Sequence, residues 1–113
     1  MDVIKLNIAS EFSRTPGARY IKEGEYSGEL FRTKYLLPKM KTAINDDKIL
    51  EVILDGSAGY GTSFLEESFG GLIRDGITYE HVKKYLRIVS NEDSSYIEEI
   101  NEYIEDANRH EAK

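Results

Sequence analysis

The chain has 113 residues, which fits one compact domain, and we expect a single domain over residues 1–113. With 40% hydrophobic and 32% charged residues, its composition is that of a globular protein, and its net charge of −6 argues against binding to the phosphate backbone of nucleic acids. The absence of cysteine excludes disulfides, thiolate nucleophiles and metal centres held by cysteine.

The amino-terminal segment carries no targeting signal that we can identify. Residues 1–10 include Asp2 and Lys5 within an alternating pattern, and they lack the apolar core of a signal peptide. We therefore expect a soluble cytoplasmic protein that does not enter a membrane.

The first half of the chain alternates between predicted strands and a predicted helix. Residues 3–8 predict a strand, and residues 18–22 predict a second strand beside it. Residues 27–45 have helical periodicity, with Ser27 as the expected N-cap. Pro38 lies inside this helix and is expected to kink it or to divide it in two. The expected buried face comprises Leu30, Leu37, Met40 and Ile44, with Leu36 and Ala43 on its flank.

The second half of the chain begins with its most continuous apolar run. Residues 49–54 predict a central strand buried on both faces. A glycine-rich loop at 56–61 leads into a helix that runs to about residue 73. A helical turn capped by Thr78, a strand at 85–89 and a last helix complete the chain, and this order favours a mixed sheet covered by helices in an α/β fold. The last helix is expected to bury Ile97, Ile100, Ile104 and Ala107.

The glycine-rich loop is the first candidate site. A strand, a loop and a helix start place backbone N–H groups at the carboxyl edge of a sheet, which suits an anion. The loop matches neither common nucleotide-binding motif and contains no lysine. Two interpretations stay open: a phosphate held at Ser63, with Asp55 turned toward a metal or a ribose, or a plain tight loop. In the second interpretation Ser63 and Glu66 form a capping box.

The arginines and histidines offer fewer indications. Arg14, Arg19 and Arg32 could converge on an anion or on a carboxylate of a partner, or they could be ordinary surface arginines. His81 and His110 are the only histidines, and we expect both to be solvated. We therefore expect no metal site and no cofactor.

The carboxylates are not arranged for acid–base catalysis. Glu66 and Glu67 are adjacent, so a helix separates them by about 100°. The acidic face of the last helix is either a solubilising surface or a docking site for a basic partner. Its acidic residues, with no basic residue among them, are Glu92, Asp93, Glu98, Glu99, Glu102, Glu105 and Asp106.

Two blocks of sequence resemble the STAS-like domain family of bacterial proteins over about residues 12–73. The first block comprises Phe12-Ser13, Pro16-Gly17-Ala18-Arg19-Tyr20, Gly24, Ser27-Gly28-Glu29-x-Phe31-Arg32 and Leu37-Pro38. The second comprises Leu54-Asp55-Gly56 and Gly59-Tyr60-Gly61-Thr62-Ser63-Phe64-Leu65-Glu66-Glu67-x-Phe69-Gly70-Gly71-Leu72. The resemblance implies a fold related to the anti-sigma-factor antagonists, with a sheet of four to five strands and helices mainly on one face.

The resemblance also implies a class of partner. In those antagonists a strand ends in Asp, and an Asp-Ser-Ser-Gly motif opens the next helix with the serine that a histidine-kinase-like (GHKL) ATPase phosphorylates. Asp55 and Ser63 lie at nearly matching places, although Thr62-Ser63-Phe64-Leu65 replaces the motif. Because STAS-like proteins are often encoded beside or fused to histidine-kinase-like ATP-binding domains, the resemblance suggests such a partner here.

We therefore expect a non-enzymatic regulatory or interaction module that contacts a protein through residues 55–71, as a monomer or weak homodimer. The alternative is a small α/β nucleotide- or phosphate-binding protein or enzyme that uses the glycine-rich loop and the Ser63 helix start. Self-association through the first sheet edge also stays open. The expected partner-binding or switch residues are Asp55, Gly59, Tyr60, Gly61, Thr62, Ser63, Glu66, Glu67 and Gly70.

Overall fold

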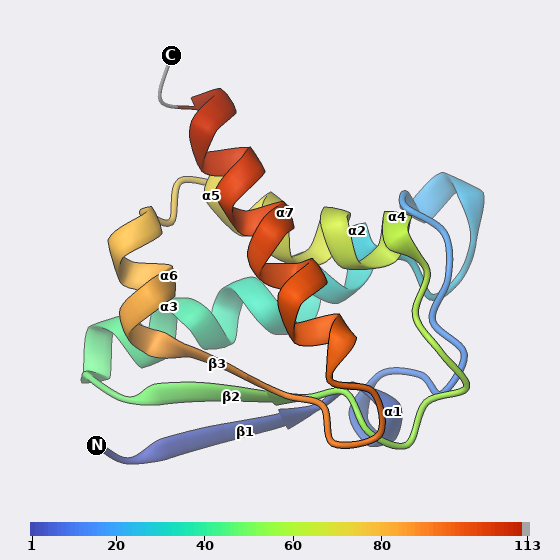
Figure 1. Cartoon of the computed structure of the whole chain (residues 1–113), viewed down its shortest axis with the longest axis horizontal. Coiled ribbons are helices and arrows are strands. Elements are labelled where there is room, and N and C mark those ends of the chain that lie inside the picture. Colours follow the sequence, from blue (N-terminus) through green and yellow to red (C-terminus); the bar gives the residue numbers. More distant parts are fainter. Residues whose placement is uncertain (112–113) are drawn as a thin grey trace.

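A computed structural model describes residues 1–111 and shows a small sheet with helices on one side (Figure 1). The strands are β1 (Val3–Asn7), β2 (Ile49–Ile53) and β3 (Leu86–Val89), which pair in parallel in the order β1-β2-β3. The helical elements are α1 (Ile8–Glu11), η1 (Ile21–Glu23), α2 (Gly28–Phe31), η2 (Arg32–Leu36), α3 (Leu37–Asp46), α4 (Thr62–Leu65), η3 (Glu66–Gly70), α5 (Gly71–Arg74), α6 (Tyr79–Tyr85) and α7 (Ser95–Glu111).

The sheet buries only one of its faces. In the central strand β2, Leu50 and Val52 are fully buried under the helices. Ile49, Glu51 and Ile53 alternate with them on the other face and are half-buried. The expectation that this strand is buried on both faces is therefore wrong, because no element among residues 1–111 covers the second face.

The sheet is also smaller than the resemblance implies, since residues 1–111 contain three parallel strands in place of a mixed sheet of four to five. The strand expected at 18–22 is absent from it. Ala18 has a φ of 56°, and η1 is a 3₁₀ turn. The N–H groups that a strand would use are occupied, because Tyr20 donates to Glu23 Oε1 and Ile21 donates to Glu29 Oε1, each at 2.9 Å.

The first long helical run extends without a break from α2 through η2 to α3. Ser27 is its N-cap as predicted, and its hydroxyl accepts a hydrogen bond from the Leu30 N–H at 3.0 Å. Pro38 does not divide the run. It follows the π-helical turn η2, where the Leu37 N–H already pairs with the Arg32 carbonyl, five residues back. A proline, which has no N–H, fits where the α-helical pairing is interrupted in this way.

The π-helical turn also changes which residues the first helical run buries. A turn of this kind holds more residues than an α-helical turn, so it rotates the following residues around the axis. The residues expected on the flank, Leu36 and Ala43, are fully buried together with Phe31 and Met40. Leu30, Leu37 and Ile44, which were expected at the centre of the face, are half-buried.

The second half of the chain follows the same plan. The run from α4 through η3 to α5 again contains one π-helical turn, η3. Thr78 caps α6 as predicted by accepting a hydrogen bond from the His81 N–H at 3.2 Å. Helix α7 crosses η3 and α5 (Figure 1). It buries Ile100, Ile104 and Ala107, whereas Ile97 is half-buried. None of the helices described between residues 1 and 111 is long and apolar enough to cross a membrane.

We expect Ile100→Ala to lower the free energy of unfolding by about 2 to 5 kcal/mol, because the Ile100 side chain is fully buried on the inner face of α7. Denaturant unfolding measures this loss. The exposed neighbour provides the control, since Asn101→Ala should change stability by less than about 0.5 kcal/mol. Equal and small effects of both substitutions would contradict the burial of this face.

Candidate functional site

Asp55, at the end of β2, organises the connection between β3 and α7. Its carboxylate accepts hydrogen bonds from the Asn91 N–H at 3.2 Å, the Asn91 side-chain amide at 3.1 Å and the Glu92 N–H at 2.9 Å. The Glu92 N–H, followed by the two donors of Asn91, lowers the pKa of Asp55. Through these bonds Asp55 fixes the loop between β3 and α7.

Four N–H groups of the glycine-rich loop are occupied in the same way, those of Gly56, Ala58, Gly59 and Tyr60. The pairs are Gly56 N–H to Glu92 Oε1 at 2.8 Å, Ala58 N–H to the Arg14 carbonyl at 2.9 Å, Gly59 N–H to Ser57 Oγ at 3.1 Å and Tyr60 N–H to the Tyr96 hydroxyl at 3.2 Å. The hollow beside this loop, of about 220 Å³, is lined by three carboxylates, those of Asp55, Glu92 and Asp93. Occupied amides and negative charge both disfavour a phosphate here.

Tyr60 anchors the loop to the sheet. Its hydroxyl donates to the Leu54 carbonyl at 2.7 Å, and its ring meets the Tyr96 ring edge-on with centroids 5.3 Å apart. Burial raises the pKa of Tyr60 to about 12. Gly59 has a φ of 147°, a conformation that side chains disfavour, so the loop needs a glycine there.

Ser63 does not cap the following helix, and the capping box expected with Glu66 is wrong. The N-cap is Gly61, with φ and ψ of −78° and 154°, and it has no side chain to accept a hydrogen bond. The helix thus begins at Thr62, and Ser63 occupies its second position, exposed to solvent. Glu66 does not reach back to the helix start, because two arginines hold its carboxylate.

The best-formed polar cluster lies behind this helix and is built on a buried ion pair. Arg32 and Glu67 are 8% and 7% exposed. The Arg32 Nη1 donates to Glu67 Oε2 at 2.7 Å and to the Glu67 backbone carbonyl at 2.5 Å, while its Nε donates to Asp75 Oδ2 at 2.8 Å. Because Arg32 begins η2 and Glu67 lies in η3, one guanidinium joins the two π-helical turns.

Glu66 extends the cluster toward the surface. Arg19 donates to its Oε1 at 2.5 Å, and Arg74 donates to its Oε2 at 2.8 Å and to its Oε1 at 3.1 Å. Burial alone would raise the pKa of Glu66, but the hydrogen bonds from Arg74 and Arg19 outweigh it and lower that pKa. Arg19 thereby ties the loop before α2 to η3.

The structure therefore places the predicted arginines in different roles. Arg19 and Arg32 converge on carboxylates, as one interpretation of the sequence allowed, but these belong to Glu66 and Glu67 of the same chain. Arg14 is exposed, and its backbone carbonyl accepts hydrogen bonds from the glycine-rich loop. Among the described residues, no group of three or more acidic or histidine side chains is placed to hold a metal ion.

Two glycines permit the close packing around this cluster. A Cβ atom on Gly28 would lie 2.7 Å from the Phe64 carbonyl oxygen, and one on Gly71 would lie 2.7 Å from Cδ of Arg32. Both distances are shorter than a real contact allows. Gly70, which was expected at the partner surface, is buried beside the Glu66 side chain.

Sequence reasoning did not single out Arg74 and Asp75 as members of the cluster. The spacing of eight residues between Glu66 and Arg74, about two helical turns, is the signal that could have paired them.

We expect Gly71→Ala to lower the free energy of unfolding by about 1 to 3 kcal/mol, because the new methyl group would displace the Arg32 side chain. In an ordinary helix the same change stabilises by about 1 kcal/mol, so the sign of the effect is diagnostic. Gly17→Ala is the control, since a Cβ there meets nothing within 4 Å. A Gly71→Ala variant as stable as the parent in urea unfolding would contradict the packing.

A second pair of variants tests the two serines at helix starts. Ser27→Ala removes a hydroxyl that caps a helix and should cost about 0.5 to 2 kcal/mol. Ser63→Ala should change the unfolding free energy by less than about 0.5 kcal/mol, because the exposed hydroxyl caps nothing. If thermal unfolding instead showed the larger loss at Ser63, the assignment of Gly61 as N-cap would be wrong.

The comparisons with known proteins bear on the same segment. A family model described as a STAS-like domain of unknown function (DUF4325) matches residues 27–96. No curated protein and no solved structure gives a significant match. The matched residues begin at the Ser27 cap and contain both π-helical turns and the Arg32–Glu67 pair. The chain belongs to the STAS-like domain family.

Proposed function

We propose that this protein is a non-enzymatic regulatory module that binds a protein partner through the start of α4, at Gly61, Thr62 and Ser63. The observation that supports the proposal is the exposed hydroxyl of Ser63. Its side chain is exposed at the second residue of a helix, and among the described residues its hydroxyl has no hydrogen-bond partner. This contrasts with residues 56, 58, 59 and 60 of the glycine-rich loop, whose N–H groups are bonded within the fold.

The surroundings of Ser63 suit recognition by a protein. Phe64 and Leu65, which follow it, are buried at 1% and 0% exposure and hold the helix in place. Behind them the Arg32–Glu67 pair fixes the next turn. A rigid surface reduces the entropy lost on binding, so this helix start is better prepared for a partner than a mobile loop.

The family resemblance suggests that the partner is a histidine-kinase-like ATPase, and Ser63 is then a candidate acceptor of phosphate. A phosphate adds a charge of about −1.5 to −2 at neutral pH, which the positive end of a helix favours. Such a charge would also change how a partner recognises the surface. The phosphate would remain stable in the fold because Ser63 is exposed and its hydroxyl is not needed as a cap.

We expect Ser63→Trp to weaken the complex at least tenfold, because a large side chain would occupy the contact surface of an otherwise intact fold. The partner is the ATPase recovered from the native host by affinity capture on the wild-type chain, and calorimetry measures the affinity. Thr42→Trp, at an exposed position on α3, is the matched control and should bind like the wild type. Equal affinity of both variants would exclude the start of α4 from the interface.

Phosphorylation is measured separately by intact-mass spectrometry after incubation with the captured ATPase and ATP. One added phosphate that is lost in Ser63→Ala would support the switch. No added phosphate, or a phosphate that is retained in Ser63→Ala, would reject Ser63 as a phosphorylation site and leave the proposal of a protein-binding module.

The alternative function, binding of a nucleotide, is tested by thermal unfolding with ATP, GTP and magnesium. A nucleotide at one hundred times its Kd would stabilise the fold by about 2.7 kcal/mol. We expect no shift.

A further inference from the structure

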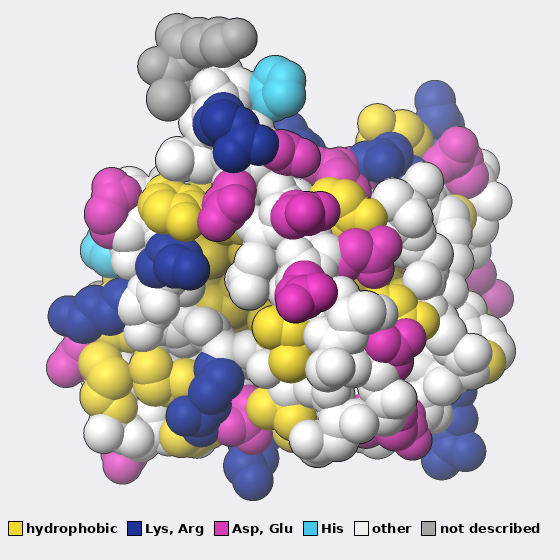
Figure 2. Space-filling model, viewed as in Figure 1, with side chains coloured by type: hydrophobic (Ala, Val, Ile, Leu, Met, Phe, Trp, Pro, Cys, Tyr) yellow, Lys and Arg dark blue, Asp and Glu magenta, His cyan; other side chains and the backbone are white. Residues whose placement is uncertain are grey.

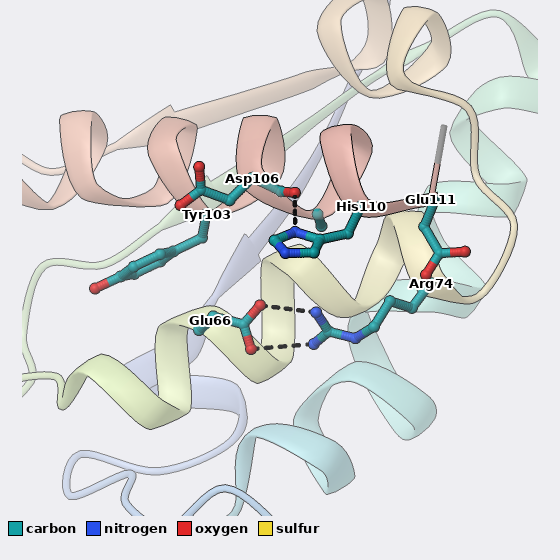
Figure 3. A pocket seen from close by; sticks show the side chains of 7 residues that line it. Glu66, Arg74, Tyr103, Asp106, His110 and Glu111 are labelled. Atoms are coloured by element: carbon teal, nitrogen blue, oxygen red, sulfur yellow. Dashed lines mark hydrogen bonds and ion pairs between the residues drawn. The ribbon is translucent and has the colours of Figure 1, made fainter. Parts of the chain in front are cut away.

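A groove separates α7 from the helical run η3–α5, which contains Glu66 and Arg74 (Figure 3). Its volume is about 440 Å³. Side chains from α7 line one side, and the Glu66–Arg74 ion pair lies opposite them. The lining residues are Glu66, Arg74, Tyr103, Asp106, Ala107, His110 and Glu111.

The groove combines an apolar wall with a neutral floor. Tyr103 and Ala107 supply the wall; Tyr103 is half-buried, and its hydroxyl donates to Glu99 Oε1 at 3.1 Å. On the floor, Glu66 is neutralised by Arg74 and Arg19. An aliphatic side-chain stem lying along the Tyr103 ring would therefore contact an apolar surface.

The rim of the groove is acidic and open to solvent. The Asp106 side chain is 54% exposed, and its ion pair with Arg109 is a surface pair that contributes at most about 1 kcal/mol. Glu111 is also exposed. His110 Nδ1 lies 2.8 Å from the Asp106 carbonyl oxygen, which orients the ring within the groove. Acidic side chains are spread along the visible face of α7 (Figure 2). Glu98, Glu102 and Glu105 of this helix are exposed.

We propose that this groove seats a basic segment of the protein partner, with one arginine or lysine whose stem packs on Tyr103 and whose cation reaches Asp106, and a second basic side chain that reaches Glu111 at the other end of the groove. The charges of rim and segment are complementary, which favours association of this kind. The groove is also continuous with the proposed partner surface, since Glu66 on its floor follows Ser63 by three residues in the same helical run. This inference rests on the proposed function and extends it to the chemistry of the partner.

The test titrates the ¹⁵N-labelled chain with the blocked peptide acetyl-(Arg-Leu-Lys-Ala)₃-amide and follows amide chemical shifts. We expect changes at residues 66, 74 and 103–111, and no changes with a peptide that has glutamate in place of arginine and lysine. The double variant Asp106→Asn, Glu111→Gln should bind the basic peptide at least tenfold more weakly. Shifts located elsewhere on the molecule would overturn the proposal.

A matched double variant separates a formed site from general attraction. Glu98→Gln, Glu105→Gln removes the same charge from exposed positions of α7 that do not line the groove, and it should weaken binding less than twofold. An equal loss in both double variants would overturn the groove in favour of diffuse electrostatics.

The two proposals can fail independently when the captured partner replaces the peptide. If Ser63→Trp loses the complex while Asp106→Asn, Glu111→Gln keeps wild-type affinity, the groove proposal is rejected and the start of α4 stays the proposed contact surface. If only the variant Asp106→Asn, Glu111→Gln loses the complex, the start of α4 is rejected as a contact surface and the groove is supported.

Discussion

The buried ion pair between Arg32 and Glu67 is the constraint on which the helical layer depends. A buried charge that loses its partner costs about 3 to 5 kcal/mol, so the two helical runs must stay together once this pair has formed. The guanidinium also satisfies the backbone carbonyl of Glu67 within a π-helical turn. It can reach that carbonyl only because position 71 has no side chain. Arg32, Glu67, Gly71 and the widened turn η3 are therefore parts of one packing arrangement.

This constraint determines what the rest of the molecule can present to a partner. Because Arg32, Arg19 and their carboxylates saturate one another, the predicted anion site does not exist as a free cluster of arginines. Four N–H groups of the glycine-rich loop are likewise bonded within the chain, among them that of Gly56 by Glu92 before α7 and that of Tyr60 by Tyr96 in α7. The start of α4 and the groove beside α7 differ from the arginine cluster and the glycine-rich loop, since both present exposed polar groups on well-packed helices. The two surfaces that we propose for recognition therefore lie on either side of the loop that the sequence emphasises.

Local signals in the sequence predicted those parts of the fold that local interactions determine. Residues three or four positions apart predict the caps Ser27 and Thr78 and the buried face of α7. The structure confirms them except at Ile97, which is half-buried. Contacts between distant residues explain the errors. Arg32 and Glu67 lie 35 positions apart, and the π-helical turns that accompany their contact rotate the buried face of the first helical run. Ser63 loses its expected role because the helix already begins at Thr62, and because Arg19 and Arg74 hold Glu66.

The uncovered face of the sheet explains why the partner surface is better sought on the helices. Parallel sheets are usually covered on both faces, and the apolar run of β2 suggests that arrangement. The register instead aligns Lys5, Glu51 and Arg87 across the middle of the three strands, and Arg87 binds Glu51 at 2.6 Å. A charged row of this kind stays hydrated, and a lysine on the edge strand opposes pairing with another strand. The middle of the open face therefore stays hydrated, whereas the groove beside α7, in which we propose a basic side chain, has an apolar wall and an acidic rim.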